Sequence, residues 1–433
     1  MGPVRIYLCA LVMVAVSAAG AAWKPHAVVP AREKDAWKTG YWLWAGQPAS
    51  SANYRPDVLY VQTKGRRWPA DLPRADRYIV VRRIEPSDRG PTRRAALALL
   101  EDYKALVADA SRSVHVDGLQ IDYDSPTDRL NDYGGFLEEV RRGLPPAARL
   151  SVTALLDWFG PRTQIAAVLR HVDEFVPQFY DLGLERAAAG IAEPIDAGKW
   201  AAIFDAYQIP YRIGISSFGR VARRRVDAAG RSDIRYFRDV SPMALATRRQ
   251  LPRSIRTSHG GESLVHYDVV APIAEMPALG VGDAVDVTLP TDLSVREAYE
   301  SARRFGGYCA GVVFFRWPNQ GETLTFEPDA VGRIVAAKPA QSGVVLEARV
   351  ATCLERHCAD LYIDLGRAGP VGRVVQIRTS GPLQAFLPDG PLRPALLRDD
   401  VMVVDIPGYA GYGTVRLGRA ISRDAVRFQV IER

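Results

Sequence analysis

Histidine and cysteine are scarce in this sequence, which has 6 His and 4 Cys among 433 residues. No two histidines have the spacing that metal ligands usually show, so we expect no metal site and no bound cofactor. A glycine-rich phosphate loop is also missing after the first strand-like segment, which argues against a dinucleotide-binding fold. The sequence has no recognisable nucleic-acid-binding motif, and we expect no nucleic-acid partner.

The N-terminal segment reads MGPVRIYLCALVMVAVSAAGAAW and combines a basic start with an apolar run. Small residues from Ser17 to Ala22 suit a cleavage site, so we interpret residues 1–22 as a secretory signal peptide. A single membrane anchor is the alternative, although the run is short for a span and no stop-transfer pattern follows. We expect an exported protein, periplasmic or extracellular, with no stable membrane insertion after cleavage.

Three cysteines lie beyond this segment. In an exported protein Cys353 and Cys358, which bracket LERH, could form a local disulfide. Cys309 lies in an apolar strand, and we expect it to be a buried free thiol.

From about Tyr41 to Ala336 the chain alternates short apolar runs with amphipathic helical stretches, a pattern typical of βα units on a parallel sheet. Eight strand candidates in succession predict an α/β fold, a (β/α)8 barrel over residues 37–338. A doubly wound open sheet is the competing architecture. The candidates are YWLWAG from Tyr41, VLYVQTK from Val58, YIVVRRIEP from Tyr78, VDGLQIDYD from Val116, LSVTALLDW from Leu150, EFVPQFYD from Glu174, RIGISSFG from Arg212 and GVVFFRWP from Gly311.

Helices are predicted between these strands, except after the first two, where the connections look too short or irregular. In the first helix Leu97, Leu100, Tyr103 and Val107 fall at steps of three and four residues, which predicts the face against the barrel. The helix candidates begin at Thr92, Asp132, Lys199 and Ser294.

After about Pro339 the pattern changes to short alternating strands separated by Gly and Pro turns. Runs of that length predict an all-β sandwich over residues 339–433. We see no catalytic cluster in it.

The formal net charge of +7 is concentrated rather than spread. Residues 220–256 contain eleven arginines against Asp227, Asp233 and Asp239, with little apolar periodicity. We interpret the region near 220–290 as a solvated insertion. A loop that meets an anionic polymer or a membrane surface is the functional alternative.

The stretch VHVDGLQIDYDSP, residues 114–126, places polar side chains in a segment that otherwise reads as a buried strand. Side chains at steps of two share a face, so Gln120, Asp122 and Asp124 point one way. In a barrel this face is the inside, and Asp124 lies at the carboxyl end, where active sites occur. Two carboxylates there should repel and raise one pKa, as an acid catalyst requires. Alternatively, both are salt-bridged to inward bases such as Lys64 or Arg83, or cap the next turn.

The run from Asp117 to Asp124 resembles the signature of family 18 glycoside hydrolases, the chitinase-like group, which reads Asp-Gly-x-Asp-x-Asp-x-Glu. Asp117, Gly118 and Asp122 match this signature, Gln120 replaces an Asp, and Asp124 stands where the family has its Glu acid. The resemblance implies a barrel glycosidase with Asp124 as the general acid and Asp122 as its partner.

Two further segments are similar to the same family. In PQFYD, residues 177–181, Tyr180 and Asp181 fall where the family contacts the reacting sugar, and Gln178 of the same segment is a further substrate-binding candidate. In GVVFFRWPN, residues 311–319, either Phe315 or Trp317 takes the place of the Trp that floors the central subsite. The chain as a whole looks most like a bacterial family of the wider barrel-glycosidase clan, DUF3142.

The family mechanism implies that the substrate's own 2-acetamido group is the nucleophile, while Tyr180 hydrogen-bonds the intermediate. An Asp reaches about 1.5 Å less than a Glu, so other readings stay open. Asp122 and Asp124 could work with another carboxylate, Glu85 or Asp157. The barrel could also be a non-catalytic carbohydrate-binding protein, or a structural envelope protein that uses its sandwich for contacts.

Other residues fit a cleft for a polysaccharide or oligosaccharide, the partner that the resemblance implies. Trp44 and Trp317 lie on or beside strand candidates, and aromatic rings suit sugar faces as well as cores. Lys64 and Arg83 are predicted at strand ends that point to the barrel mouth, where they would favour an anionic or highly hydroxylated ligand. The sequence leaves the oligomeric state open.

Overall fold

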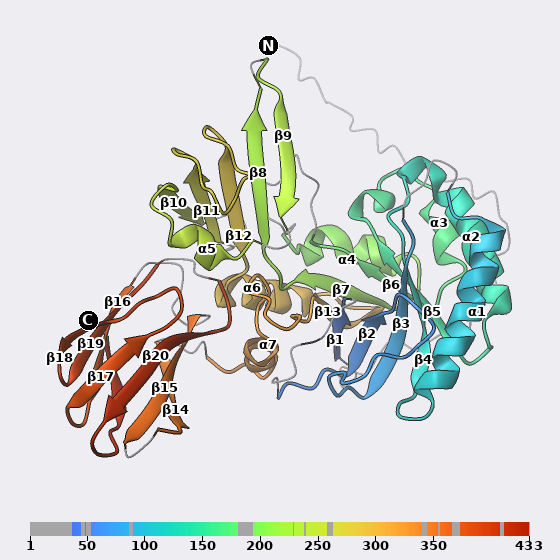
Figure 1. The fold of residues 1–433 in the computed structure, drawn as a ribbon. Coiled ribbons are helices and arrows are strands. Elements are labelled where there is room, and N and C mark those ends of the chain that lie inside the picture. Colours follow the sequence, from blue (N-terminus) through green and yellow to red (C-terminus); the bar gives the residue numbers. More distant parts are fainter. Residues whose placement is uncertain are drawn as a thin grey trace, which may run out of the picture.

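The computed structural model forms a barrel, an inserted sheet and a sandwich (Figure 1). It describes residues 37–44, 48, 53–85, 90–180, 194–227, 229–237, 240–257, 263–339, 344–353, 356–365, 373–407 and 411–432. The predicted signal peptide, residues 1–22, lies outside these ranges. Within them, no helix is both long and apolar enough to cross a bilayer.

Eight parallel strands close into a barrel in the order β1-β13-β7-β6-β5-β4-β3-β2. Each of the eight strand candidates supplies one of these strands, so the (β/α)8 prediction is confirmed and the open sheet is wrong. The strands are β1 (Lys38–Leu43), β2 (Val58–Gln62), β3 (Arg77–Arg83), β4 (Val116–Asp122), β5 (Arg149–Ala154), β6 (Glu174–Pro177), β7 (Tyr211–Ser216) and β13 (Cys309–Phe315).

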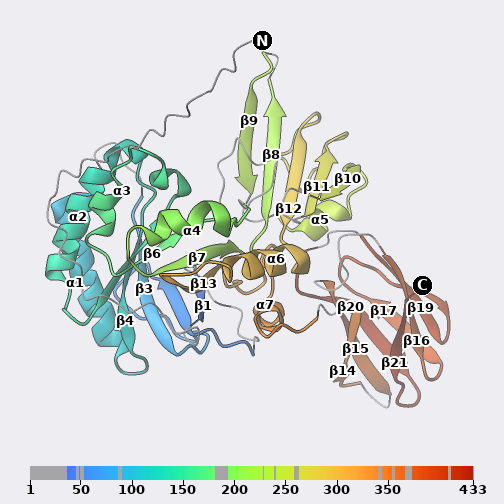
Figure 2. The same ribbon diagram turned by 180° about the vertical axis from the view of Figure 1, so that it is seen from behind.

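Helices cover the outside of the barrel (Figure 2). The side chain of Thr92 caps the first of them by accepting a hydrogen bond from the Ala95 N–H. The predicted face of this helix is partly wrong, because Leu97 is 54% exposed and the buried stripe includes Ala96 and Leu99 instead. The described connection from β2 to β3 contains no helix, as expected. The elements are α1 (Arg93–Ala110), η2 (Thr127–Arg129), α2 (Leu130–Gly143), η3 (Leu156–Phe159), α3 (Ile165–Leu169), α4 (Ala197–Asp205), α6 (Asp292–Ala302) and α7 (Pro328–Val335).

The arginine-rich insertion between β7 and β13 is a five-stranded antiparallel sheet in the order β10-β11-β12-β8-β9, and not the solvated segment that we expected. Val221 and Val287 are buried in it. Several of its arginines pair with acids, some from far along the chain, such as Arg225 with Asp283 at 2.7 Å. The elements are β8 (Arg220–Val226), β9 (Ser232–Phe237), α5 (Pro242–Ala246), β10 (Arg253–Thr257), β11 (Ser263–Asp268) and β12 (Ala284–Leu289).

The C-terminal strands form two four-stranded sheets, in the orders β14-β15-β20-β17 and β18-β19-β16-β21. Between them lies a core that includes Leu361, Ile377 and Leu417. Cys353 and Cys358 form a disulfide, whereas Cys309 is a buried free thiol in the barrel, both as expected. The strands are β14 (Val345–Ala351), β15 (His357–Asp364), β16 (Arg373–Thr379), β17 (Leu383–Pro388), β18 (Ala395–Arg398), β19 (Val401–Ile406), β20 (Thr414–Ser422) and β21 (Phe428–Glu432).

The sandwich is attached to the rest of the molecule near the insertion, which stands above α6 between barrel and sandwich in both views (Figures 1 and 2). Met243 of α5 belongs to the sandwich core. In the opposite direction Tyr412 packs edge-on against Phe326, with ring centres 5.5 Å apart, and its hydroxyl donates to the Pro290 carbonyl. The Tyr412 N–H donates to the Thr323 carbonyl at 2.8 Å. The three parts therefore share contacts in one region.

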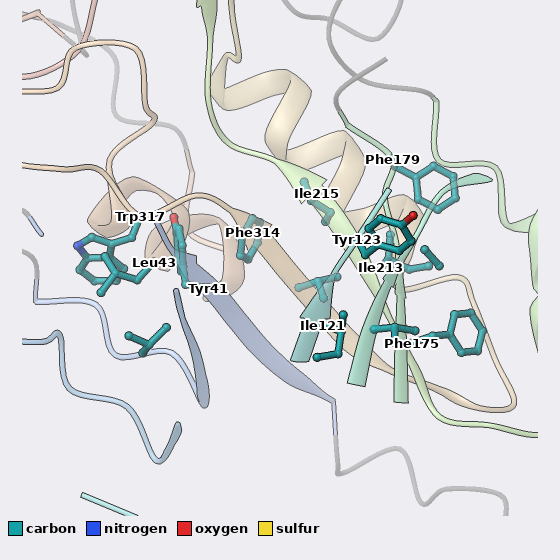
Figure 3. Packing of buried hydrophobic residues seen from close by; sticks show 14 of the residues in the cluster. Tyr41, Leu43, Ile121, Tyr123, Phe175, Phe179, Ile213, Ile215, Phe314 and Trp317 are labelled. Atoms are coloured by element: carbon teal, nitrogen blue, oxygen red, sulfur yellow. The ribbon is translucent and has the colours of Figure 1, made fainter. Parts of the chain in front are cut away.

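Side chains of the barrel strands alternate between two separate clusters. Trp42, Tyr60, Val81, Val176 and Val313 point inward and pack together. The outward residues face the helices, and Figure 3 shows fourteen residues of that outer cluster, including Ile121, Phe175 and Phe314. This alternation decides which polar residues of the strands can reach the barrel mouth.

A buried ion pair lies inside the barrel, between Glu174 of β6 and Arg212 of β7. Arg212 Nε donates to Glu174 Oε2 at 2.8 Å, and the Tyr60 hydroxyl donates to Oε1 at 2.7 Å. Burial alone would raise the pKa of Glu174, but Arg212, Arg149 and Tyr60 hold it below its ordinary value. Glu174 is therefore a paired carboxylate of the barrel interior.

Candidate active site

Asp122 and Asp124 lie at the carboxyl end of β4 on the same face of the strand, as their spacing predicts. Tyr123 between them is buried on the opposite side and meets Tyr133 of α2, with ring centres 5.1 Å apart. Both carboxylates line a small hollow in the barrel mouth, with a cavity volume of about 30 Å³. Its lining is Trp42, Trp44, Arg83, Asp122, Asp124, Thr153, Gln178, Tyr180 and Phe315.

The environment of Asp122 favours the protonated carboxyl group. Burial and the neighbouring charge of Asp124 raise the pKa of Asp122 to about 6, although Thr153 and Arg83 act in the opposite direction. The Thr153 hydroxyl donates to Asp122 Oδ1 at 3.0 Å and fixes the orientation of the carboxyl group. Nothing in the sequence pattern singled out Thr153, because its role depends on the register between β4 and β5.

Asp124 is the more exposed of the two acids. The surrounding walls still exclude enough water to raise its pKa, and the charges of Glu85 and Asp157 act in the same direction, while Arg83 opposes them. Among the described residues, neither Asp122 nor Asp124 forms an ion pair. The alternative, in which both acids are salt-bridged to Lys64 or Arg83, is therefore wrong for that part of the chain.

Aromatic rings form the floor and one wall of the hollow. Tyr180 stacks on Phe315 with ring centres 4.6 Å apart and planes 7° apart, while Trp42 meets both rings edge-on. Burial and the charges of Asp122 and Asp124 raise the pKa of Tyr180, so its phenol stays a hydrogen-bond donor. Of the two aromatic candidates in the last barrel strand, Phe315 is the one at this floor.

Trp317 does not line the hollow, so the prediction that it contacts the substrate is wrong. It is 1% exposed and packs edge-on against Tyr41 in the outer cluster, with ring centres 5.1 Å apart (Figure 3). The backbone N–H of Trp317 donates to the Trp42 carbonyl at 2.7 Å. This bond holds the segment after β13 against β1, with the indole ring directed outward.

Gln120 lies beneath the hollow, so the prediction that it binds the substrate directly is wrong. It is fully buried inside the barrel, since Oε1 accepts a hydrogen bond from Trp42 Nε1 at 2.6 Å and Nε2 donates to Ser151 Oγ at 3.1 Å. The amide supplies both an acceptor and a donor here, which a carboxylate could not do. Gln120 therefore holds Trp42 in place.

Four charged candidates lie around the hollow. The Arg83 guanidinium is 5.3 Å from the ring centre of Trp44 and 3.2 Å from the carboxylate of Glu85. The Glu85 side chain is 79% exposed and does not line the hollow. Asp157 is exposed on η3 and accepts from the Thr127 hydroxyl at 2.7 Å. Lys64 is exposed and lines a neighbouring hollow.

Two candidates come from the end of β6. Gln178 is buried and lines the hollow, and its backbone bridges to Gly214 of β7. Asp181 lies outside the described residues. In the described ranges, no three His, Cys, Asp or Glu side chains are grouped as a metal site would require.

Comparisons with known proteins bear on the segment that carries these acids. Residues 79–253 match the family model of a domain of unknown function, DUF3142. The resemblance to DUF3142 is thereby confirmed for this segment. The DUF3142 segment holds Arg83, Asp122, Asp124, Gln178 and Tyr180, whereas Trp42, Trp44 and Phe315 come from outside it. The hollow thus combines DUF3142 residues with residues from the first and last barrel strands.

Solved structures similar to this chain are more distant. The spore cortex-lytic enzyme SleL of Bacillus cereus is 14% identical, with 70% of this chain and 74% of that chain covered and a TM-score of 0.41. The chitinase ChiA74 of Bacillus thuringiensis is 10% identical, with coverages of 82% and 80% and a TM-score of 0.37. The GH18 chitinase ChiB of Flavobacterium johnsoniae is 11% identical, with coverages of 69% and 93% and a TM-score of 0.37. No curated protein matches the chain.

Proposed function

We propose that this protein is an exported glycoside hydrolase that acts on a polysaccharide of the cell envelope or its surroundings. One observation carries the proposal. Two carboxyl groups without an ion pair to any described residue face an aromatic floor at the carboxyl end of a barrel strand, and the pKa of Asp122 is raised to about 6. The pKa of Asp124, the proposed acid, is raised as well, and a carboxyl group with a raised pKa can act in acid catalysis.

In the proposed reaction Asp124 donates its proton to the glycosidic oxygen as the bond to the anomeric carbon breaks. The 2-acetamido oxygen of the sugar attacks that carbon, as the resemblance to family 18 implies. Asp122 orients the acetamido N–H and stabilises the charge that develops on it, while the Tyr180 hydroxyl donates to the acetamido group. Water then opens the cyclic intermediate and returns a proton to Asp124. The faces of Phe315 and Trp44 suit the apolar face of a pyranose ring.

The main alternative is a carbohydrate-binding barrel without hydrolytic activity. It is favoured by Glu85 and Asp157, because Glu85 is held by Arg83 and Asp157 by Thr127, both away from the hollow. Asp122 and Asp124 would then have no third carboxylate to assist them. A structural envelope protein that uses the sandwich for its contacts is a weaker alternative.

Export is part of the proposal. It is supported by the signal-like residues 1–22 and by the disulfide between Cys353 and Cys358, a bond that persists in oxidising compartments.

The test is the release of reducing ends from a panel of bacterial and plant polysaccharides by the mature protein. Asp124→Asn and Asp122→Asn should each reduce release by at least about a hundredfold, with circular dichroism unchanged. Asp128→Asn is the matched control, because Asp128 is exposed on η2 and does not line the hollow. Cleavage that survives Asp124→Asn would disprove the acid assignment. Oligosaccharide binding without cleavage of any polymer would favour the binding protein.

A further inference from the structure

A second hollow, called here the β2 hollow, opens beside the acids at the carboxyl end of β2. Its cavity volume of about 340 Å³ lies in the range of ligand pockets, about 300–1000 Å³. Trp44 lines both this hollow and the one at Asp122 and Asp124, and also a third one beside the insertion, so the three form one cleft. A sugar chain that reaches the acids can place its next unit in the β2 hollow. The lining residues are Leu43, Trp44, Gln62, Thr63, Lys64, Arg67 and Pro69.

The charged groups of the β2 hollow are both bases. Lys64 and Arg67 are exposed, and neither forms an ion pair with a residue in the described ranges. Thr63 is 7% exposed, and its hydroxyl accepts a hydrogen bond from Arg82 Nη1 at 3.4 Å, which leaves its own proton for a ligand. Two cations and a hydroxyl donor suit an anion.

The loop after β2, which carries these groups, is held in shape by Arg82 of β3. Arg82 Nη1 donates to the carbonyls of Thr63 and Gly65 at 3.3 and 3.2 Å. Asp102 of α1 pairs with Arg82 at 2.8 Å and with Arg66 of the loop at 2.6 Å. The loop is therefore ordered before a ligand arrives, which lowers the entropic cost of binding.

The far end of the same loop is also anchored to α1. The backbone N–H of Trp68 donates to the Asp109 carboxylate at 2.8 Å. Lys64 and Arg67 lie between the two anchors, and the nearby acids Asp102 and Asp109 bind other groups of the loop. The two bases are thus available to a ligand.

The opposite side of the cleft is arranged differently. There a hollow of about 740 Å³ lies between the barrel mouth and the insertion sheet. Arg316 is paired with Glu322 at 2.7 Å, Arg83 is paired with Glu85 at 3.2 Å, and Arg220 donates to a tyrosine hydroxyl at 3.0 Å. An anion would have to displace a glutamate from either of those pairs, whereas the β2 hollow holds no such competitor among the described residues.

We infer that the β2 hollow binds an anionic substituent, a carboxylate or a sulfate ester, on the sugar next to the one held over Phe315. The inference rests on the proposed function for the position of that neighbouring sugar. Lys64 and Arg67 pair with the anion, and the Thr63 hydroxyl donates a further hydrogen bond to it. Because the anion site lies on one side of the acids, it also fixes the direction in which the sugar chain lies in the cleft.

The test compares charge states of one sugar backbone by isothermal titration calorimetry. Chondroitin oligosaccharides are used with their carboxylates, with sulfate esters alone after carboxyl reduction, and with neither group. Polygalacturonate oligosaccharides, native and carboxyl-reduced, form a second series. In at least one series we expect a charged form to bind about tenfold more tightly than the neutral form, with the difference shrinking in about 0.5 M salt. The preferred form identifies the anion. Equal affinities, or binding of none of the forms, would overturn the inference.

Substitutions locate the effect. Lys64→Gln combined with Arg67→Gln should weaken binding of the charged form by about three- to tenfold and leave the neutral form unchanged. Arg66→Gln combined with Arg94→Gln is the matched control, since it removes two exposed bases that do not line the cleft. If the control pair weakens binding equally, the anion is attracted by the net charge of +7 rather than by the β2 hollow.

The same oligosaccharides separate this inference from the proposed function. A preference for a charged form that depends on Lys64 and Arg67, without cleavage of any glycan, supports the anion site and contradicts the hydrolase. Cleavage of neutral chitin oligosaccharides that depends on Asp124, without a preference for any charged form, supports the hydrolase and contradicts the anion site.

Discussion

Asp122 and Asp124 share one face of β4 but differ in how far water reaches them. Asp122 is the more enclosed residue, and Thr153 fixes its carboxyl group from the next strand. Asp124 stands farther out, between the opposing charges of Arg83 and Glu85. A substitution at Asp122 therefore tests the raised pKa of its carboxyl group. A substitution at Asp124 tests how far the carboxyl group must extend toward the substrate.

Asp122→Asn should stabilise the folded protein at neutral pH. The folded state holds the Asp122 proton up to about pH 6, whereas the unfolded chain releases it near the ordinary pKa of 3.8. Between these values the folded state binds more protons, so stability falls as pH rises and stays lower above pH 6. At about 1.4 kcal/mol per pKa unit, the gain at pH 7.5 is about 2 kcal/mol after allowance for partial exposure.

Urea unfolding at pH 3.5 and pH 7.5 checks this, with Asp128→Asn as control. The gain should appear only at the higher pH and only for Asp122→Asn. An equal gain at both pH values would show that the pKa of Asp122 is not raised.

Asp124→Glu tests whether the site is built for the shorter acid. The extra methylene moves the carboxyl group by about 1.5 Å, and a misplacement of about 1 Å costs on the order of a hundredfold in rate. We expect kcat on the best polymer of the panel to fall by about that factor, with KM little changed. A rise in kcat would mean instead that Asp124 is too short for its task, and Asp124→Asn supplies the baseline for either result.

At the level of strands and helices, β13 approaches β1 so closely that only glycine fits at one position. Gly311 has φ of +139°, and a Cβ built there would lie 1.8 Å from the Lys38 carbonyl oxygen. The register between β13 and β7 shifts at this point as well, between Cys309 and Gly311. Phe315, four residues later, depends on this register for its place at the floor.

Gly311→Ala should therefore destabilise the protein by more than about 3 kcal/mol, because backbone of β1 or β13 must move to admit the methyl group. Gly306→Ala is the matched control, since a Cβ there has no neighbour within 4 Å. Thermal unfolding of the two variants measures the difference. Equal melting temperatures would show that the barrel can relax at this position.

The sequence was sufficient to predict the barrel strands, because their apolar runs are short, regularly spaced and interrupted by amphipathic helices. It also placed Asp122 and Asp124, since alternation along a strand fixes which side chains face inward. Tyr180 was found through the resemblance to family 18. It failed for Trp317, whose direction is set by a hydrogen bond to β1, and for Thr153, which depends on strand register. The insertion sheet was missed because the acids that pair with its arginines, such as Asp283, lie far along the chain.

On the scale of the whole molecule, barrel, insertion and sandwich meet around Tyr412. Its ring is buried against Phe326, and its backbone and hydroxyl each donate to a carbonyl outside the sandwich. Thr323, which accepts one of these bonds, also lines the insertion side of the cleft. The sandwich thus supports one wall of the proposed binding region.

Tyr412→Ala should weaken this attachment by about 3–5 kcal/mol, the usual cost of removing a buried aromatic ring. Differential scanning calorimetry should then show a separate, earlier transition for the sandwich. Tyr362→Ala is the control, because Tyr362 lies half-buried on β15 and stacks with Arg349 of the same sandwich. A single transition for Tyr412→Ala, as for the control, would mean that other contacts hold the domains together.

The ion pair between Glu174 and Arg212 has a consequence for how this protein can change over evolutionary time. The pair is electrically neutral as a unit, and neither member is among the groups that shift the pKa of Asp122. Substitutions at the barrel mouth can therefore retune proton affinity without disturbing the charge balance below. Descendants of this chain are free to exchange one chemistry for another while they inherit the same lower barrel.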